Sequence, residues 1–125
     1  MGDDRGKLIS LEENKNIPFD IKRVYYIFDT KENTVRGKHS HPNLQQVVVC
    51  TSGSCKFSLD DGKNKKIVEL DSPEIGLFIG ENIWREMYDF SSDCVLMVLA
   101  NEYYNEDEYI RDYEEFLEKN KNSII

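Results

Sequence analysis

The segment from Arg36 to His41 contains the only two histidines of this 125-residue chain. Alternate side chains of an extended strand point to the same face, so the imidazoles of His39 and His41 are expected to lie side by side. An imidazole can move protons near neutral pH or ligate a metal ion. The spacing therefore predicts either an acid–base pair or half of a metal site, and the neighbouring Arg36 favours an anionic ligand.

The elements that must position this pair are short strands. Apolar and alternating segments recur about every 8 to 12 residues, separated by Gly, Asp, Asn and Ser, and this spacing indicates a β-sandwich or small barrel. The expected strands are 20–28, 39–41, 45–50, 55–60, 66–70, 76–79, 83–88 and 94–100. The chain is long enough for one domain, and we expect residues 1–125 to form it.

Two of these segments carry further detail. In the strand over 20–28, Arg23 and Tyr25 alternate with Val24 and Tyr26, so they should share a face with apolar neighbours. Residues 105–119 have apolar side chains at helical spacing, and Asn105 resembles the first residue of a capping box. The chain is therefore predicted to end in one amphipathic helix whose tyrosines are packing residues.

Composition excludes several classes of protein. The net charge of −8 and the pI near 4.8 argue against binding to nucleic acid or to a membrane surface, which favour a basic face. No apolar run is long enough to span a bilayer, and the first residues do not resemble a signal peptide. Three cysteines without CxxC spacing indicate reduced, structural thiols. We expect a cytoplasmic protein.

The metal interpretation requires further ligands. An HxH on a strand of a small β-barrel resembles the first half of the cupin metal motif, but Gln45 stands at its carboxylate position. A later segment resembles the second half, yet Trp84, Arg85 and Glu86 occur where its histidine should follow. Two histidines are fewer than the three protein ligands usual for catalytic zinc. We therefore expect no metal and a proton-transfer role, with ordinary strand histidines as the alternative.

Longer motifs resemble one family. The segments 17–28 (IPFDIKRVYYIF) and 36–41 (RGKHSH) are similar to the cupin-fold dTDP-sugar 3,4-ketoisomerases, and so are 70–73 (LDSP), 84–87 (WREM), 89–96 (DFSSDCVL), 103–104 (YY) and 109–113 (YIRDY). The resemblance implies an all-β fold, a cupin-type small β-barrel or jelly roll with one C-terminal α-helix. It also implies a cytoplasmic isomerase that converts dTDP-4-keto-6-deoxy-D-glucose to a dTDP-3-keto-6-deoxyhexose, without a cofactor, for 3-amino-3,6-dideoxy sugar biosynthesis.

The same resemblance suggests roles for individual residues. His39 is the expected base for the carbon-bound proton, with His41 and Tyr25 as shuttle or orienting groups. Arg36 is the first candidate for the pyrophosphate, since a guanidinium makes paired charge-assisted hydrogen bonds. The remaining substrate-binding candidates are Arg5, Arg23, Gln45, Trp84 and Arg85. In the family the first strand can be exchanged between subunits, so residues 1–16 are expected to carry Arg5 to the partner's site in a homodimer.

Two other classes remain open at this point. One is a nucleotide-sugar 3,5-epimerase on a related barrel, which also removes a proton next to a ketone. The other is a non-catalytic cupin that binds a sugar nucleotide or stores a metal. For the isomerase itself, the sequence leaves the gluco or galacto configuration of the product unassigned.

Overall fold

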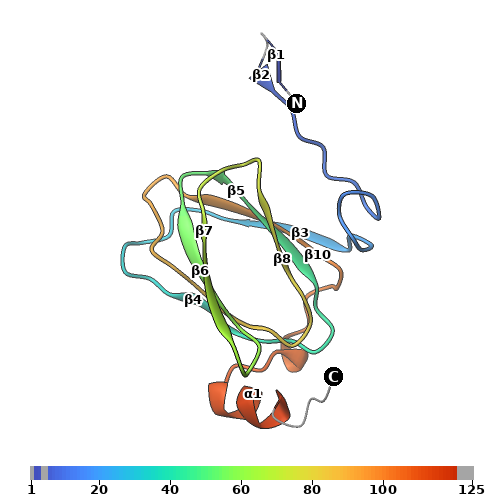
Figure 1. Cartoon of the computed structure of the whole chain (residues 1–125), viewed down its shortest axis with the longest axis vertical. Coiled ribbons are helices and arrows are strands. Elements are labelled where there is room, and N and C mark those ends of the chain that lie inside the picture. Colours follow the sequence, from blue (N-terminus) through green and yellow to red (C-terminus); the bar gives the residue numbers. More distant parts are fainter. Residues whose placement is uncertain (1, 4–5, 121–125) are drawn as a thin grey trace.

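The computed structural model describes residues 2–3 and 6–120 and consists of two four-stranded antiparallel sheets that face each other (Figure 1). One sheet has the order β3-β10-β5-β8 and the other β4-β9-β6-β7. The strands are β3 (Arg23–Ile27), β4 (Arg36–His39), β5 (Gln46–Ser52), β6 (Cys55–Asp60), β7 (Lys65–Leu70), β8 (Gly76–Ile79), β9 (Trp84–Tyr88) and β10 (Val95–Ala100). The predicted all-β, cupin-type barrel is confirmed.

The core between the sheets follows from alternation along the strands. Val48 and Cys50 of β5 face Phe57 of β6 and Leu96 of β10 in one cluster of buried side chains. The intervening Val47 and Val49 point to the opposite face of the same sheet. Strand β10 is buried on both faces, as its run of apolar residues predicts. The barrel interior is thus apolar at one end, and its polar residues lie at the other.

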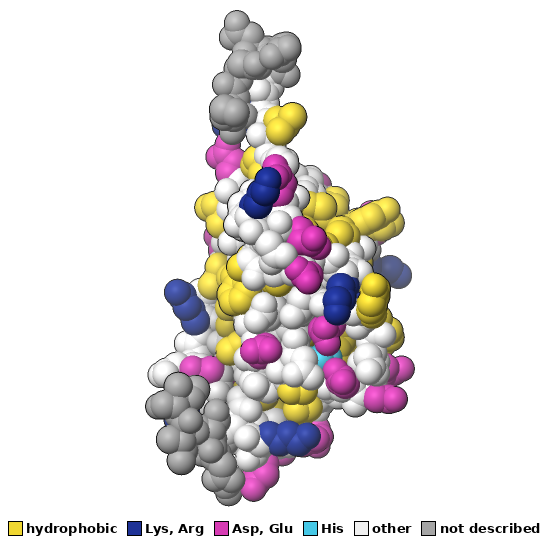
Figure 2. Space-filling view, turned by 90° about the vertical axis from the view of Figure 1, so that its right-hand side faces the viewer, with side chains coloured by type: hydrophobic (Ala, Val, Ile, Leu, Met, Phe, Trp, Pro, Cys, Tyr) yellow, Lys and Arg dark blue, Asp and Glu magenta, His cyan; other side chains and the backbone are white. Residues whose placement is uncertain are grey.

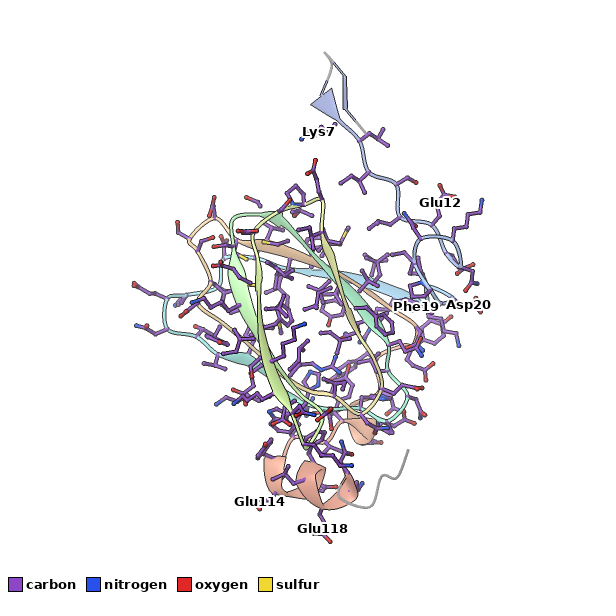
Figure 3. The ribbon with its side chains drawn as sticks, in the orientation of Figure 1. Lys7, Glu12, Phe19, Asp20, Glu114 and Glu118 are labelled. Carbon is purple, nitrogen blue, oxygen red and sulfur yellow. The ribbon has the colours of Figure 1, made fainter. Side chains whose placement is uncertain are left out.

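The end of the N-terminal part packs on the outer face of one sheet, whereas the chain before it lies away from the barrel. Ile17 and Phe19 pack with Val47, Val49 and Leu99 in a second buried cluster. Before this, the chain extends away from the barrel and ends in a small hairpin of β1 (Gly2–Asp3) and β2 (Gly6–Lys7) (Figures 1 and 3). An ion pair of 2.9 Å joins Lys7 Nζ to Glu74.

The C-terminal segment differs from the predicted helix over 105–119. A single 3-10 turn, η1 (Glu106–Glu108), is followed by extended chain, and the α-helix α1 (Tyr113–Asn120) begins only afterwards. Asn105 does act as a cap, because its side chain accepts a hydrogen bond from the Asp107 N–H. The helix cannot continue through Ile110, because this residue exchanges two backbone hydrogen bonds of 2.9 Å with Ser40.

Helix α1 is short and packs by one face. Phe116 is buried against Trp84 and Ile110 on the outside of the second sheet, whereas Glu114 and Glu118 point away from the barrel (Figure 3). The helix therefore closes one end of the molecule and anchors the extended segment that precedes it. No helix among the described residues is long and apolar enough to cross a membrane.

Candidate active site

A β-bulge in β4 aims the first histidine into the barrel. In the ladder with β9, Gly37 lies opposite Glu86 and His39 opposite Arg85, so Lys38 is the extra residue. Gly37 and Lys38 both have positive φ, and a Cβ on Gly37 would approach the Arg85 carbonyl oxygen to 3.1 Å. The bulge therefore depends on a glycine at this position and sets His39 opposite a buried arginine.

His39 lies between an aromatic ring and cations. Its imidazole stacks on Tyr109 with 4.7 Å between ring centroids and 10° between planes. Burial, followed by the positive charges of Arg85 and Arg111, lowers the pKa of His39 from 6.5 to about 3. Its Nδ1 is buried and has no hydrogen-bond partner among the described residues. His39 is thus a neutral imidazole at physiological pH with one ring nitrogen that has no hydrogen-bond partner among the described residues.

His41 is held differently. Its side chain is 1% exposed, and its Nδ1 accepts a hydrogen bond of 2.9 Å from the Asn43 backbone N–H. Its Nε2 lies 3.1 Å from a carboxylate oxygen of Glu108, and its edge meets Tyr109 at 5.2 Å. Burial lowers the pKa of His41, and the Glu108 carboxylate opposes this shift. The predicted pairing of the two histidines is present, but only His39 has a ring nitrogen without a partner.

A second polar chain crosses the interior from β9 to β3. The Arg85 guanidinium, 2% exposed, donates to the Gln46 side-chain oxygen, and the Gln46 amide donates to the Tyr25 hydroxyl at 2.9 Å. Arg85 also donates to the Ile83 carbonyl at 3.0 Å. Burial lowers the pKa of Arg85 to about 10 and raises that of Tyr25. At neutral pH the chain therefore presents a charged guanidinium and a protonated phenol.

Arg23 connects the two groups of residues. Its guanidinium lies over the Tyr25 ring at 5.1 Å and donates to the Tyr109 hydroxyl at 3.2 Å. Its Nε is buried without a hydrogen-bond partner among the described residues. Together with Arg85 it supplies positive charge at this site in an acidic protein. Such a site suits a substrate that carries or develops negative charge.

The structure brings together only some of the residues proposed from the sequence. Arg23, Tyr25, His39, His41 and Arg85 gather in the interior. The other candidates lie elsewhere or outside the described residues.

Arg36 is exposed and lies opposite Met87 at the far side of the bulge, so the structure shows it near no other site residue. Gln45 is half-buried, and its backbone contacts Asn101. Arg5 lies outside the described residues.

Trp84, a substrate-binding candidate from the sequence, packs on the outside of the barrel. Trp84 packs edge-on against Tyr113 and against Phe116, and its indole N–H donates to Glu86. Since neighbouring residues of a strand point to opposite faces, the inward direction of Arg85 places Trp84 outside the barrel.

Three residues at the site were missed by sequence reasoning. Gln46 precedes the inward-facing Val48 by two positions, so strict alternation would have selected it instead of Gln45. Glu108 and Tyr109 were assigned to a packing helix, and no local pattern reveals their contact with the histidines. Within residues 2–3 and 6–120, no group of three His, Cys, Asp or Glu side chains is arranged to hold a metal ion.

The lowered pKa of His39 predicts a pH-dependent stability. In the unfolded chain His39 becomes protonated near pH 6.5, whereas in the folded protein it stays neutral until about pH 3. The free energy of unfolding should therefore fall as pH falls below 6.5. Between pH 7 and 5 the wild type is expected to lose about 1–2 kcal/mol more than His39→Asn. Urea unfolding of both proteins at the two pH values measures this, and equal losses would contradict it.

These features define an acid–base enzyme built inside a cupin-like barrel, and comparison with known proteins identifies its family. The family model FdtA (WxcM-like, C-terminal) matches residues 1–121. A TDP-4-oxo-6-deoxy-α-D-glucose-3,4-oxoisomerase of Aneurinibacillus thermoaerophilus is 60% identical over 114 residues, which are 91% of this chain and 82% of that protein. The chain belongs to the FdtA family, and it is a TDP-sugar 3,4-ketoisomerase, as its sequence motifs indicate.

Solved structures agree with this assignment. A 3,4-ketoisomerase from Helicobacter canadensis is 54% identical with a TM-score of 0.94, covering 98% of this chain and 92% of that one. A variant of the ketoisomerase QdtA from Thermoanaerobacterium thermosaccharolyticum, in complex with TDP-4-keto-6-deoxyglucose, is 46% identical with a TM-score of 0.96, covering 100% and 91%. These similarities favour the isomerase over the 3,5-epimerase and the non-catalytic cupin.

Proposed function

We propose that the chain converts dTDP-4-keto-6-deoxy-D-glucose to a dTDP-3-keto-6-deoxyhexose, with His39 as the base. The observation that carries this role is the buried, neutral imidazole with an unpartnered Nδ1 beside Arg23 and Arg85. His39 takes the proton from C3, and the electron pair forms a C3–C4 double bond while the C4 carbonyl oxygen becomes an enediolate oxygen. Transfer of the O3 proton to O4, and return of the proton from His39 to C4, then give the 3-ketone with a hydroxyl at C4.

The polar chain from Arg85 to Tyr25 supports the oxygen chemistry. The charged guanidinium favours the negative charge of the enediolate. The Tyr25 hydroxyl, oriented by Gln46, is a proton carrier suited to exchange between O3 and O4. His41 assists indirectly, because it packs against Tyr109, the ring that stacks on His39. Arg36, which is exposed at the start of β4, and Arg5 stay the candidates for the pyrophosphate.

The assay that tests the function follows the sugar by NMR. In D₂O the purified protein is expected to replace the C3 hydrogen of dTDP-4-keto-6-deoxyglucose with deuterium and to form a 3-keto product, which a 3-aminotransferase traps. The configuration at C4 is read from the trapped product. Exchange confined to C5 would indicate an epimerase, and no change in the sugar would refute catalysis on this substrate.

We further propose that the protein is a cytoplasmic homodimer in which the N-terminal segments are exchanged. The outer face of the β3-β10-β5-β8 sheet exposes Val24, Tyr26 and Phe28. On the same side of the molecule, a groove of about 430 Å³ is lined by Ile9, Leu11, Val49 and Met97, among others. Figure 2 also shows hydrophobic side chains below the arm, which is the N-terminal segment that projects from the barrel.

A second copy of the chain is the occupant that fits this face. The arm extends away from its own barrel (Figure 1), and its Leu8 is 74% exposed. The exposed Leu8 and Ile9 of the arm and the apolar face of the sheet are complementary between two copies of the chain, so both are buried at once. In such a dimer Arg5 would reach the partner's active site.

This arrangement predicts the effect of a charge on the sheet. Tyr26→Glu is expected to weaken dimerisation by on the order of 100-fold, because it buries an unpaired carboxylate. Sedimentation equilibrium measures the change. Tyr103→Glu is the matched control, since Tyr103 is similarly exposed but lies after β10, outside this sheet. A dimer of unchanged affinity with Tyr26→Glu would refute this interface.

A further inference from the structure

The hydrogen bonds of His41 determine which of its nitrogens carries the proton. A backbone N–H can only donate, so Nδ1, which accepts from Asn43 at 2.9 Å, has the lone pair. In a neutral imidazole the proton is then on Nε2, which lies 3.1 Å from Glu108 and donates to its carboxylate. His41 is therefore fixed as a single tautomer, and neither nitrogen is left for the substrate.

Glu108 reaches the ring from the solvent side of the molecule. Its side chain is 39% exposed, whereas His41 is 1% exposed. A carboxylate so close to water keeps its charge at little cost, and it still contacts a buried imidazole. The contact comes from η1, on the segment that sequence patterns assign to a packing helix.

Backbone hydrogen bonds join the same segment to Ser40, the residue between the two histidines. Ser40 N donates to Ile110 O and Ile110 N donates to Ser40 O, both at 2.9 Å. This bridge places Tyr109 across the pair, parallel to His39 and edge-on to His41. Glu108 and Tyr109 thus contact the imidazoles through a carboxylate and an aromatic ring, and the backbone bridge at Ile110 holds both residues in place.

We propose that Glu108 is a positioning residue of the isomerase, which holds the His41 ring by accepting a hydrogen bond from its Nε2–H and so keeps Tyr109 stacked on the base His39. The role rests on the proposed function for its effect on turnover. Its structural part, the hydrogen bond between His41 and Glu108, is independent of any substrate.

The charges around His41 fix the direction of the electrostatic effect. Glu108 and Glu102, both after β10, favour the protonated ring, while Arg85 of β9 and Arg23 of β3 disfavour it. His39 and Tyr109 complete the surroundings. Without the Glu108 charge, Glu102 is the remaining carboxylate that raises the pKa of His41 against the effect of burial. The pKa of His41 should therefore fall further.

The test uses the fact that the chain has only two histidines. In protein labelled with ¹⁵N-histidine, wild-type His41 is expected to show a protonated Nε2 and an unprotonated Nδ1. Both Glu108→Gln and Glu108→Leu should keep this tautomer, because Asn43 still donates to Nδ1. In Glu108→Leu the Nε2–H loses its acceptor, so its ¹H and ¹⁵N resonances should shift, whereas Glu108→Gln keeps an acceptor oxygen and should move them less. In the NMR assay, Glu108→Leu is expected to lower kcat about 10- to 100-fold, as loss of a carboxylate that orients a histidine does elsewhere, with KM nearly unchanged and partial rescue by Glu108→Gln.

The control is Asp107→Asn, which removes the same charge one residue earlier from an exposed side chain and should change neither readout. The spectra also report whether each variant is folded. If the Nε2–H resonances of His41 are unchanged in Glu108→Leu, or if they change while kcat does not, the positioning role is refuted. If the wild type shows the expected tautomer but no turnover, the proposed function fails and the assignment of His41 stands.

Discussion

His39→Asn is expected to lower the rate of isomerisation about 10³-fold, the largest effect of any single substitution in this site. An asparagine amide keeps a polar group of similar size in the stack with Tyr109 but cannot accept a proton near neutral pH. Since His39 Nδ1 makes no hydrogen bond to the described residues, its removal leaves no protein partner unsatisfied at that atom. The loss should therefore be in kcat, with substrate affinity and folding retained.

The measurement is deuterium exchange at C3 of dTDP-4-keto-6-deoxyglucose. Exchange reports proton removal itself, before the later steps, so it should disappear in His39→Asn. His41→Asn is the internal comparison: both nitrogens of His41 are occupied by Asn43 and Glu108, so this variant should slow exchange without abolishing it. Wild-type exchange in His39→Asn, or its loss in His41→Asn alone, would transfer the role of base to His41.

The site could be predicted from the sequence where strands are regular. Arg23 and Tyr25 lie within β3, whose alternate residues are exposed and half-buried in turn, and the period of two was enough to place both on the inner face. The HxH motif was informative for the same reason. Arg85 was selected by its position after Trp84 in the family pattern, and the structure places it opposite His39.

Prediction failed where the backbone departs from regular geometry. Strand β4 ends at His39, and β5 begins only at Gln46. Gln45 was selected from its position in the cupin motif, four residues after His41, although Gln46 faces the interior. The extra residue in β4 similarly separates Arg36 from the histidines in register. Neither shift follows from local propensity, because a bulge is fixed by its pairing with β9.

The segment after β10 shows how a tertiary contact overrides a helical pattern. Its apolar spacing is helical, and Asn105 caps a turn as expected. The backbone bridge between Ser40 and Ile110 holds Tyr109 in an extended conformation. Local sequence patterns contain no information about this long-range pairing, so Glu108 and Tyr109 could be assigned to the site only from the structure.

Arg85→Met is expected to lower kcat about 10²- to 10³-fold, the range seen when one donor to a developing oxyanion is lost. Arg85 is a buried cation whose hydrogen-bond acceptors are neutral, the Gln46 amide oxygen and the Ile83 carbonyl. Among the described residues no carboxylate lies within 4.0 Å of its guanidinium. A buried charge without a counter-ion is costly, and its retention is explained if an anion forms beside it during the reaction.

The substitution separates this electrostatic role from a structural one. Methionine removes the charge cost but leaves the Gln46 oxygen unpaired, and these effects oppose each other, so the free energy of unfolding should change by only about 1 kcal/mol. Arg85→Lys keeps the charge without the two-point contact to Gln46 and Ile83, and should retain more activity than Arg85→Met. Lys56→Met, on the exposed part of β6, controls for the loss of one cation. If activity fell only in proportion to the unfolded fraction in urea titrations, Arg85 would be a packing residue. The negative charge of the enediolate would then have to be stabilised by Arg23.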